Sequence, residues 1–248
     1  SDLSHKNLNF SDRKEMQIKY NIRDGLMMEK LEIILNGTYN QNKSVNNLLS
    51  DKGSEVKTQF LNSQSLGAKY LVFDPYKNEK WHSLSLTSWK KNNSLRWIDL
   101  IPAVSVYAGV NYVPEDAYFY NDPFTEIKKT TSYETNENTI SFKGSIITQN
   151  HFLKKWVLVN NFIYDRIGTE NVTINNITTL THNFNNPIWS SMIEHELIQN
   201  DIYADNLVKV GLAYLFNKSY QFDLSFGTNF KDSPNNLFLR AGVSTRLD

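Results

Sequence analysis

Residues 220–230, with the sequence YQFDLSFGTNF, alternate between apolar and polar side chains over nearly their whole length. The even positions hold Tyr220, Phe222, Leu224, Phe226, Thr228 and Phe230, whereas the odd positions hold Gln221, Asp223, Ser225, Gly227 and Asn229. Successive side chains of a β-strand point to opposite faces, so this stretch predicts a strand with one apolar and one polar face. Its length agrees with the roughly 9 to 11 residues that a tilted strand needs to cross a lipid bilayer.

The stretches on either side repeat this alternation. Residues 237–247 place leucine, alanine and valine on one face, and they place Arg240 and Arg246 on the other. Residues 207–216 place Lys209 opposite a row of apolar side chains. The last third of the chain therefore predicts three consecutive strands of the same amphipathic kind.

The predicted connections between strands differ in length from one side to the other. A tight turn is expected at residues 217–219, whereas longer loops are expected at 231–236, 41–59 and 114–139. Short turns on one side and long loops on the other are typical of outer-membrane β-barrels, whose short turns face the periplasm. A soluble β-sandwich has no physical reason to separate its loops in this way.

Eight further stretches upstream carry strand signals. They are residues 15–23, 30–39, 66–73, 98–112, 140–148, 156–167, 172–183 and 188–198. Bacterial single-chain barrels have an even strand number, so we expect one more strand, at residues 3–10, and about twelve in all. Residues 81–89 also alternate, which predicts a hairpin extension or an interfacial segment. The fold expected is a single all-β domain over residues 1–248, a transmembrane antiparallel up-and-down β-barrel.

The composition excludes several other classes of protein. The formal net charge is zero, which argues against a general nucleic-acid binder. Cysteine is absent, so disulfides and thiolate metal sites are excluded. The chain has no run of the roughly 18 to 20 apolar residues that a transmembrane helix needs. Aromatic residues make up 13% of the chain, and such side chains are favoured on strands and at membrane interfaces.

Charged side chains fall on the polar face of the predicted strands. By alternation, the candidate lumen-lining residues are Lys19, Arg23, Glu32, Lys69, Lys143, Glu194, Glu196, Lys209, Asp223, Arg240 and Arg246. Both signs of charge occur on adjacent strands, where opposite residues are about 5 Å apart. Two interpretations stay open. The charges could line a pore and select its solute, or they could fill a narrow lumen with ion pairs.

Catalysis, cofactors and metals are not expected. The sequence has five histidines, and none lies in a Ser, Asn and Gly setting of the kind that outer-membrane phospholipases use. His195 stands between Glu194 and Glu196, but adjacent strand residues face opposite sides, so the three cannot converge on one metal ion.

The five tryptophans fall near predicted strand ends or short turns. They are Trp81, Trp89, Trp97, Trp156 and Trp189. Amphipathic rings at such positions predict an interfacial belt at headgroup depth.

Several of these stretches resemble one known family. The matching residues are 18–20, 31–33, 66–70, 101–104, 210–214, 222–227 and 238–244. They resemble the outer-membrane transporters named after the meta-pathway of phenol degradation, and this resemblance implies a transport channel. The chain departs from the family pattern in two places: it ends on Asp248 and not on an aromatic residue, and residues 74–97 are longer than the family's usual turn.

Three hypotheses about function follow. The first is a porin-like passive channel for small hydrophilic or aromatic solutes, integral to the outer membrane of a Gram-negative bacterium. The second is a non-conducting accessory barrel in a larger secretion or assembly complex, with other outer-membrane proteins as partners. The third is a soluble β-sandwich binding module. Under the first two, the main partner is the lipid bilayer with its lipopolysaccharide, and no nucleic acid is expected.

Overall fold

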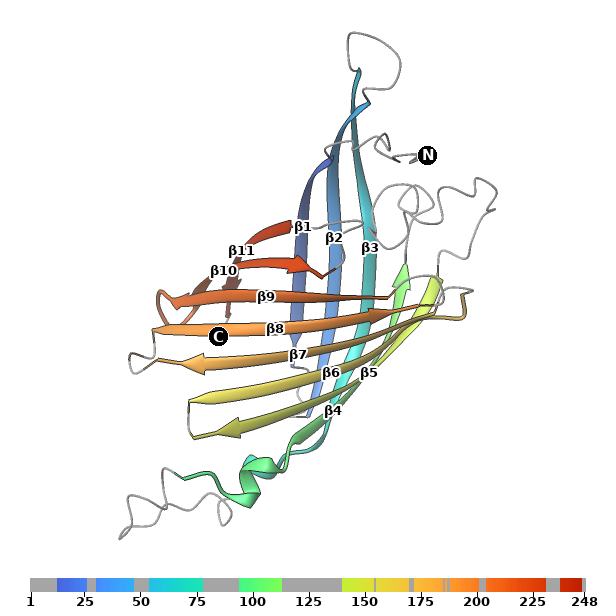
Figure 1. Cartoon of the computed structure of the whole chain (residues 1–248). Helices are drawn as coiled ribbons and strands as arrows, with labels where there is room; N and C mark the ends of the chain where they lie inside the picture. The colour runs from blue at the N-terminus through green and yellow to red at the C-terminus, as the bar shows by residue number, and fades with distance from the viewer. Residues whose placement is uncertain are drawn as a thin grey trace, which may run out of the picture. The chain divides into compact units, whose positions relative to one another are not determined.

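The computed structural model describes residues 13–25, 30–46, 54–77, 94–112, 140–153, 155–169, 172–184, 186, 188–200, 204–230 and 237–246 (Figure 1). Within these ranges lie eleven strands and two short 3-10 helices. The strands are β1 (Arg13–Asp24), β2 (Leu31–Asn46), β3 (Ser54–Phe73), β4 (Ala103–Tyr112), β5 (Ile140–Phe152), β6 (Trp156–Ile167), β7 (Thr173–Asn183), β8 (Trp189–Gln199), β9 (Ala204–Leu215), β10 (Tyr220–Asn229) and β11 (Leu237–Thr245). The 3-10 helices are η1 (Pro75–Lys77) and η2 (Trp97–Leu100).

The strands form one antiparallel up-and-down sheet in which each strand pairs with the next along the chain. This confirms the predicted all-β antiparallel class. Among the described residues, β1 and β11 each have a hydrogen-bonded neighbour on one side, so this part of the sheet is open. The closed barrel stays a prediction.

The chain divides into two compact units. The first contains Ser1–Arg23, Ile34–Leu66 and Asn111–Ile140, and the second contains Asp24–Ile33, Gly67–Val110 and Ser141–Asp248. The second unit includes the strands β6 to β11 and nearly all of β5, and β5 to β9 run side by side in Figure 1. The prediction of a single domain over residues 1–248 stays a prediction.

Eleven of the twelve predicted strands are present in the described residues, but several boundaries were wrong. The strand expected from residue 98 begins at Ala103, because residues 97–100 form η2 and Pro102 has no backbone N–H for the ladder. The loop expected at residues 41–59 is shorter, because β2 continues to Asn46 and β3 begins at Ser54. Backbone pairing extends this hairpin beyond its apolar alternation. The predicted strand at 3–10, the segment 81–89 and the loop 114–139 lie outside the described residues.

The exposed and buried faces of the sheet are inverted relative to a soluble protein. In β10, Phe222, Leu224 and Phe226 are 44%, 54% and 44% exposed, whereas Ser225 and Asn229 are 6% and 7% exposed. The same face continues onto β11, where Leu239 is 73% exposed. We call the face with these apolar side chains the apolar face, and the opposite one the polar face.

Buried residues follow the same inversion. Among the described residues, the buried polar or charged side chains are Asp99, Ser105, Ser141, Asn150, Thr173, Asp205, Ser225 and Asn229, while the buried hydrophobic set is Ile34, Tyr107, Ile198 and Leu207. Exposed large hydrophobic side chains occur on β1 and on each of β3 to β11 among the described residues. A sheet of this kind has no sizeable apolar core of its own.

Two glycines on the polar face make room for aromatic rings of the next strand. A Cβ atom at Gly67 would overlap the Tyr107 ring, and one at Gly227 would overlap the Phe238 ring and lie 2.8 Å from Cγ of Lys209. Gly227 is directly opposite both Lys209 and Phe238 in the register of β9, β10 and β11. The absence of a side chain at residue 227 therefore lets a cation and a ring meet across β10.

The turn between β9 and β10 confirms the prediction at residues 217–219. The Asn217 side-chain carbonyl accepts hydrogen bonds from the backbone N–H groups of Ser219, at 2.9 Å, and Tyr220, at 2.8 Å. Asparagine commonly closes turns in this way. The last residues of β5 and β7 and the first residues of β6 and β8 lie at the same end of the sheet, which we call the short-turn end.

Candidate functional site

The polar face of β7 to β11 brings together four side chains around Lys209. Its Nζ atom lies 2.8 Å from a carboxylate oxygen of Glu194 and 2.6 Å from one of Glu196. The Thr179 hydroxyl donates to the second oxygen of Glu194 at 3.0 Å, and the Phe238 ring centroid is 5.8 Å from Nζ. We call Thr179, Glu194, Glu196, Lys209 and Phe238 the Lys209 cluster.

The register of the sheet explains this convergence. Thr179 is opposite Glu194, Glu194 is opposite Lys209, and Lys209 is opposite Gly227. Glu196 follows Glu194 by two residues on the same face of β8, so both carboxylates reach one lysine. The charged side chains are 15% to 20% exposed and the cluster carries one positive and two negative charges. Partial burial makes this pairing stronger than a surface ion pair.

Two further ion pairs lie on the polar face of the second unit. Lys69 of β3 is 2.7 Å from Glu32 of β2, and Lys143 of β5 is 3.2 Å from Asp165 of β6. Asp165 was not among the candidates from sequence, although its odd position in β6 places it on the polar face. The register of β5 against β6 shifts between Phe142 and Gly144, and no sequence pattern signals such a bulge.

The remaining candidates are not joined to these pairs. Arg23 donates to the Asn21 side chain at 2.9 Å in an exposed setting. Lys19, Arg240 and Arg246 are exposed, and the Asp223 carboxylate lies against Gly242 of β11. Six of the eleven candidates thus form ion pairs with a side chain of opposite charge on the neighbouring strand. They are Glu32, Lys69, Lys143, Glu194, Glu196 and Lys209. The position of all eleven in a lumen stays a prediction.

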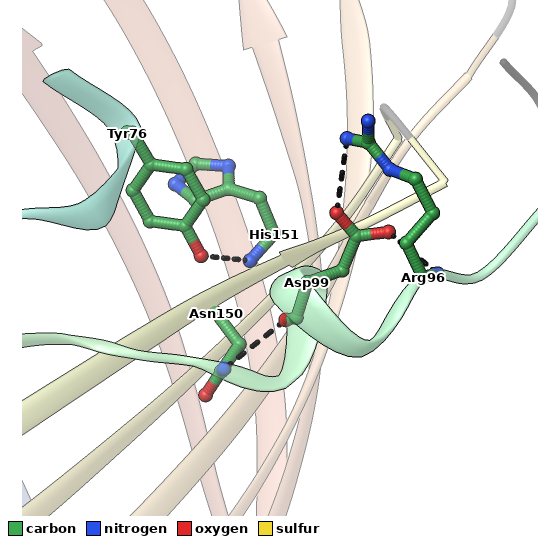
Figure 2. A network of polar contacts seen from close by, with 5 residues as sticks. All are labelled: Tyr76, Arg96, Asp99, Asn150 and His151. Atoms are coloured by element: carbon green, nitrogen blue, oxygen red, sulfur yellow. Dashed lines mark hydrogen bonds and ion pairs between the residues drawn. The ribbon is translucent and has the colours of Figure 1, made fainter. Parts of the chain in front are cut away.

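A second polar cluster lies at the short-turn end, where the segment between β3 and β4 meets the end of β5 (Figure 2). The Tyr76 hydroxyl of η1 accepts a hydrogen bond from the His151 backbone N–H at 2.8 Å and donates to the Gln149 carbonyl at 3.4 Å. Its ring also packs edge-on against the His151 ring, with centroids 4.5 Å apart. One tyrosine thereby satisfies two backbone groups at the end of β5.

η2 contributes the other half of this cluster (Figure 2). Asp99 is 7% exposed, its carboxylate accepts from the Arg96 backbone N–H at 3.0 Å, and it is 3.3 Å from the Arg96 guanidinium. The Asn150 side chain donates to the Asp99 carbonyl at 3.3 Å. Burial raises the pKa of the Tyr76 hydroxyl, the hydrogen bond from His151 lowers it, and the nearby Asp99 and Asp74 carboxylates raise it further. We call Tyr76, Arg96, Asp99, Asn150 and His151 the rim network.

Aromatic rings gather at the same short-turn end. Trp156 and Trp189 are the first residues of β6 and β8 and are 37% and 44% exposed. The Trp156 and His182 rings are 4.2 Å apart, and the Trp189 and Tyr214 rings are 4.7 Å apart. Trp97 of η2 is 88% exposed. Trp81 and Trp89 lie outside the described residues, and the interfacial role of all five stays a prediction.

In the described ranges, no three histidine, cysteine, aspartate or glutamate side chains are grouped so that they could hold a metal ion. The His195 ring Nε2–H donates to the Asn206 side-chain carbonyl at 3.1 Å. The described residues contain no helix that is long and apolar enough to cross a membrane.

Residues 20–247 match the family described as "Putative MetA-pathway of phenol degradation". The chain belongs to this family. No curated protein sequence matches the chain significantly. The resemblance seen in the separate strand motifs is therefore confirmed over most of the chain.

The MetA-pathway family match covers nearly the entire sheet. It begins within β1 and extends past the end of β11, so it includes the Lys209 cluster, the rim network and ten of the eleven candidate residues, with Lys19 just before it. The rim network residues of η1 and η2 lie at the two ends of the connection between β3 and β4. Neither Tyr76 nor Asp99 could be identified from the sequence, because Tyr76 lies outside every predicted strand and Asp99 lies in η2, where a strand was predicted.

Proposed function

We propose that this member of the MetA-pathway family is an integral outer-membrane β-barrel that acts as a passive, non-enzymatic channel for small solutes. The inverted sheet is the observation that carries the proposal. Phe222, Leu224, Phe226 and Leu239 are exposed, while the side chains between them on β10 are polar and more buried. Burying one large apolar side chain is worth about 1.5 to 3 kcal/mol. A face made of such side chains is unfavourable in water and favourable against lipid.

Closure of the sheet is the second part of the proposal. An unpaired strand edge leaves backbone N–H and C=O groups without partners, and each costs several kcal/mol in hydrocarbon. We propose that the free edges of β1 and β11 become paired in the membrane. The even strand number of bacterial barrels favours a twelfth strand between them, and residues 3–10 keep that role as a prediction.

Transport is supported by the polar face and by the family. The polar face has ion pairs, the Asp223 carboxylate and exposed arginines. Charged or polar solutes that pass through a barrel can interact with such side chains. The family's description mentions phenol degradation, so small aromatic solutes are the first to test. Purified protein in planar bilayers should give reproducible conductance steps that phenol or a related solute reduces. Silent membranes at high protein load would contradict the channel.

A second candidate function is favoured by the Lys209 cluster itself. Its side chains come from four of the five consecutive strands β7 to β11 and are largely paired with one another, as in a barrel whose lumen is filled. Such a barrel would serve as a non-conducting accessory subunit of a larger outer-membrane complex. Isolation from native membranes in mild detergent should then recover a stoichiometric partner. Recovery of the barrel alone, together with conductance, would leave the channel as the better account.

A further inference from the structure

The short helix η2 lies against the apolar face of β5, at the short-turn end of the second unit. Asn150 shares a face of β5 with Ile146, which is directly opposite Phe162 of β6, and these two apolar side chains are 52% and 50% exposed. Asn150 itself is only 8% exposed, and its side-chain N–H donates to the Asp99 carbonyl of η2 (Figure 2). This contact places η2 on the side of the sheet that the proposed function assigns to lipid.

Large apolar side chains of η2 and its flanks are exposed at this place. Trp97 is 88% exposed, the highest exposure of any large hydrophobic side chain in the described residues, and Leu95 and Leu100 are 56% and 46% exposed. The backbone that carries them is held by the Asp99 carboxylate, which accepts from the Arg96 N–H, and by the contact of Asp99 with β5. The protein therefore holds an apolar surface in place without covering it.

The end of β5 sets the depth of this surface. Asn150, which η2 contacts, is two residues from the last residue of β5, Phe152. Phe152 is directly opposite Trp156, the first residue of β6, which is 37% exposed. In a membrane barrel the strands end near the headgroups, where tryptophan rings are favoured. Trp97 is therefore at the depth of the headgroups if the sheet spans the membrane.

The exposed charges around this surface are positive. Lys77 of η1 is exposed, and so is Lys155, whose backbone N–H donates to the last residue of β5 at 3.2 Å. Arg96 is partly exposed. The two carboxylates nearby are turned inward: Asp99 is 7% exposed, and Asp74 accepts from a backbone N–H of η1 at 2.9 Å. Three cations and two carboxylates give a net charge of +1, with the positive charges outermost.

We propose that this surface is an anchor that binds the headgroups of anionic phospholipids in the leaflet at the short-turn end. We call Lys77, Leu95, Trp97, Leu100 and Lys155 the η2 anchor. Its apolar side chains enter the bilayer beside the headgroups, and its lysines attract the lipid phosphates. The position of η2 on the lipid side of the sheet favours a lipid as the partner, and the exposed cations favour an anionic one. The proposal rests on the membrane location proposed above.

A fluorophore on η2 tests the contact with lipid, because the chain has no cysteine of its own. Leu95→Cys places a thiol in the η2 anchor, and Leu224→Cys is the matched control, 54% exposed on the apolar face of β10 before substitution. Each labelled protein is reconstituted in phosphatidylcholine vesicles with a minor share of lipid brominated on its acyl chains, either phosphatidylglycerol or phosphatidylcholine. Brominated phosphatidylglycerol should quench L95C about 3- to 5-fold more efficiently than brominated phosphatidylcholine, and L224C should show no difference.

The other outcomes separate this proposal from the membrane location. Equal quenching of L95C by the two lipids would overturn the preference for anionic lipid. Quenching of L224C without quenching of L95C would overturn the η2 anchor and leave the membrane location standing. Recovery of the protein in the aqueous fraction, with neither label quenched, would contradict both.

Substitutions of the lysines test the charge of the anchor. Lys77→Gln together with Lys155→Gln, in the L95C background, should bring the quenching by the two lipids close to equality. Lys218→Gln is the matched control, because Lys218 is exposed at the same end but lies on the turn between β9 and β10. That turn is about 19 Å away across the sheet, beyond the Debye length of about 10 Å in 0.1 M salt. An unchanged preference in the double variant, or an equal loss in K218Q, would overturn the role of the two lysines.

Discussion

Lys209 illustrates how single residues on the polar face depend on their partners. One ammonium group is shared by two carboxylates, and all three side chains are at most 20% exposed. Removing one member of a buried ion pair costs more than the pair contributes, because a charge is left without compensation. Glu194 retains the Thr179 hydroxyl as a partner if Lys209 is lost. The negative charges of Glu194 and Glu196 then lie side by side on one face of β8 without Lys209 between them.

We expect Lys209→Met to lower the free energy of unfolding by about 2 kcal/mol, less than a fully buried pair because of the partial exposure. Urea unfolding in lipid vesicles measures this. Lys143→Met is the control, since its partner Asp165 lies 3.2 Å away and both side chains are more than 20% exposed. The control should cost less than about 1 kcal/mol. Adding Glu196→Gln to Lys209→Met should recover part of the loss; equal losses for K209M and K143M would contradict the account.

The Tyr76 hydroxyl joins η1 of the rim network to β5, and its removal should change how the stability of the protein depends on pH. Its pKa is raised above 10.0 in the folded chain, so above pH 10 the unfolded chain releases this proton first and the folded state loses stability. Tyr76→Phe should cost about 1 kcal/mol below pH 9, through the lost hydroxyl hydrogen bonds, and should decline less steeply above pH 10.

Denaturant midpoints of the two proteins at pH 8 and pH 11 check this expectation. Tyr220→Phe is the matched control, because Tyr220 is 47% exposed and its hydroxyl has no hydrogen bond among the described residues. A Y76F variant as stable as Y220F at pH 8, with the same decline at pH 11, would contradict the role of Tyr76.

In the strand pair of β10 and β11, Gly227 leaves the space that the Phe238 ring occupies. A methyl group there would overlap the Phe238 ring and lie 2.8 Å from Cγ of Lys209. We expect Gly227→Ala to destabilise the protein by about 1 to 3 kcal/mol, the usual cost of overpacking. Gly144→Ala is the control in β5, since a Cβ atom at that position meets nothing within 4 Å. Unfolding midpoints measure both, and Phe238→Ala should relieve the G227A effect; a G227A midpoint equal to that of G144A would contradict this fit.

The strands themselves could be predicted from the sequence because each carries its own alternation. Residues 220–230 and 237–247 needed no tertiary information, and their faces are those observed. Features that depend on other parts of the chain could not be predicted. The Lys143–Asp165 pair needs a bulge, Tyr76 meets His151 across 75 residues of chain, and β2 and β3 extend beyond the stretches that the sequence predicts. The predicted start of a strand at residue 98 was wrong, because this residue lies in η2 despite the strand preference of its sequence.

For the whole molecule, the central point is the inversion of polarity across the sheet. A soluble protein of this length would bury its phenylalanines and leucines and expose its serines and asparagines. Here the reverse holds on β10 and β11, and the buried set of the described residues is mainly polar. This single property links the proposed membrane location to the proposed lumen.

The most direct test of this account is the accessibility of spin labels placed one at a time at residues 221 to 226, with the protein reconstituted in lipid bilayers. Labels at 222, 224 and 226 should be relaxed by oxygen, which concentrates in the membrane, and labels at 221, 223 and 225 should not, giving a period of two residues. A water-soluble relaxing agent that reaches 222, 224 and 226 as readily as oxygen does, or no period at all, would contradict the account.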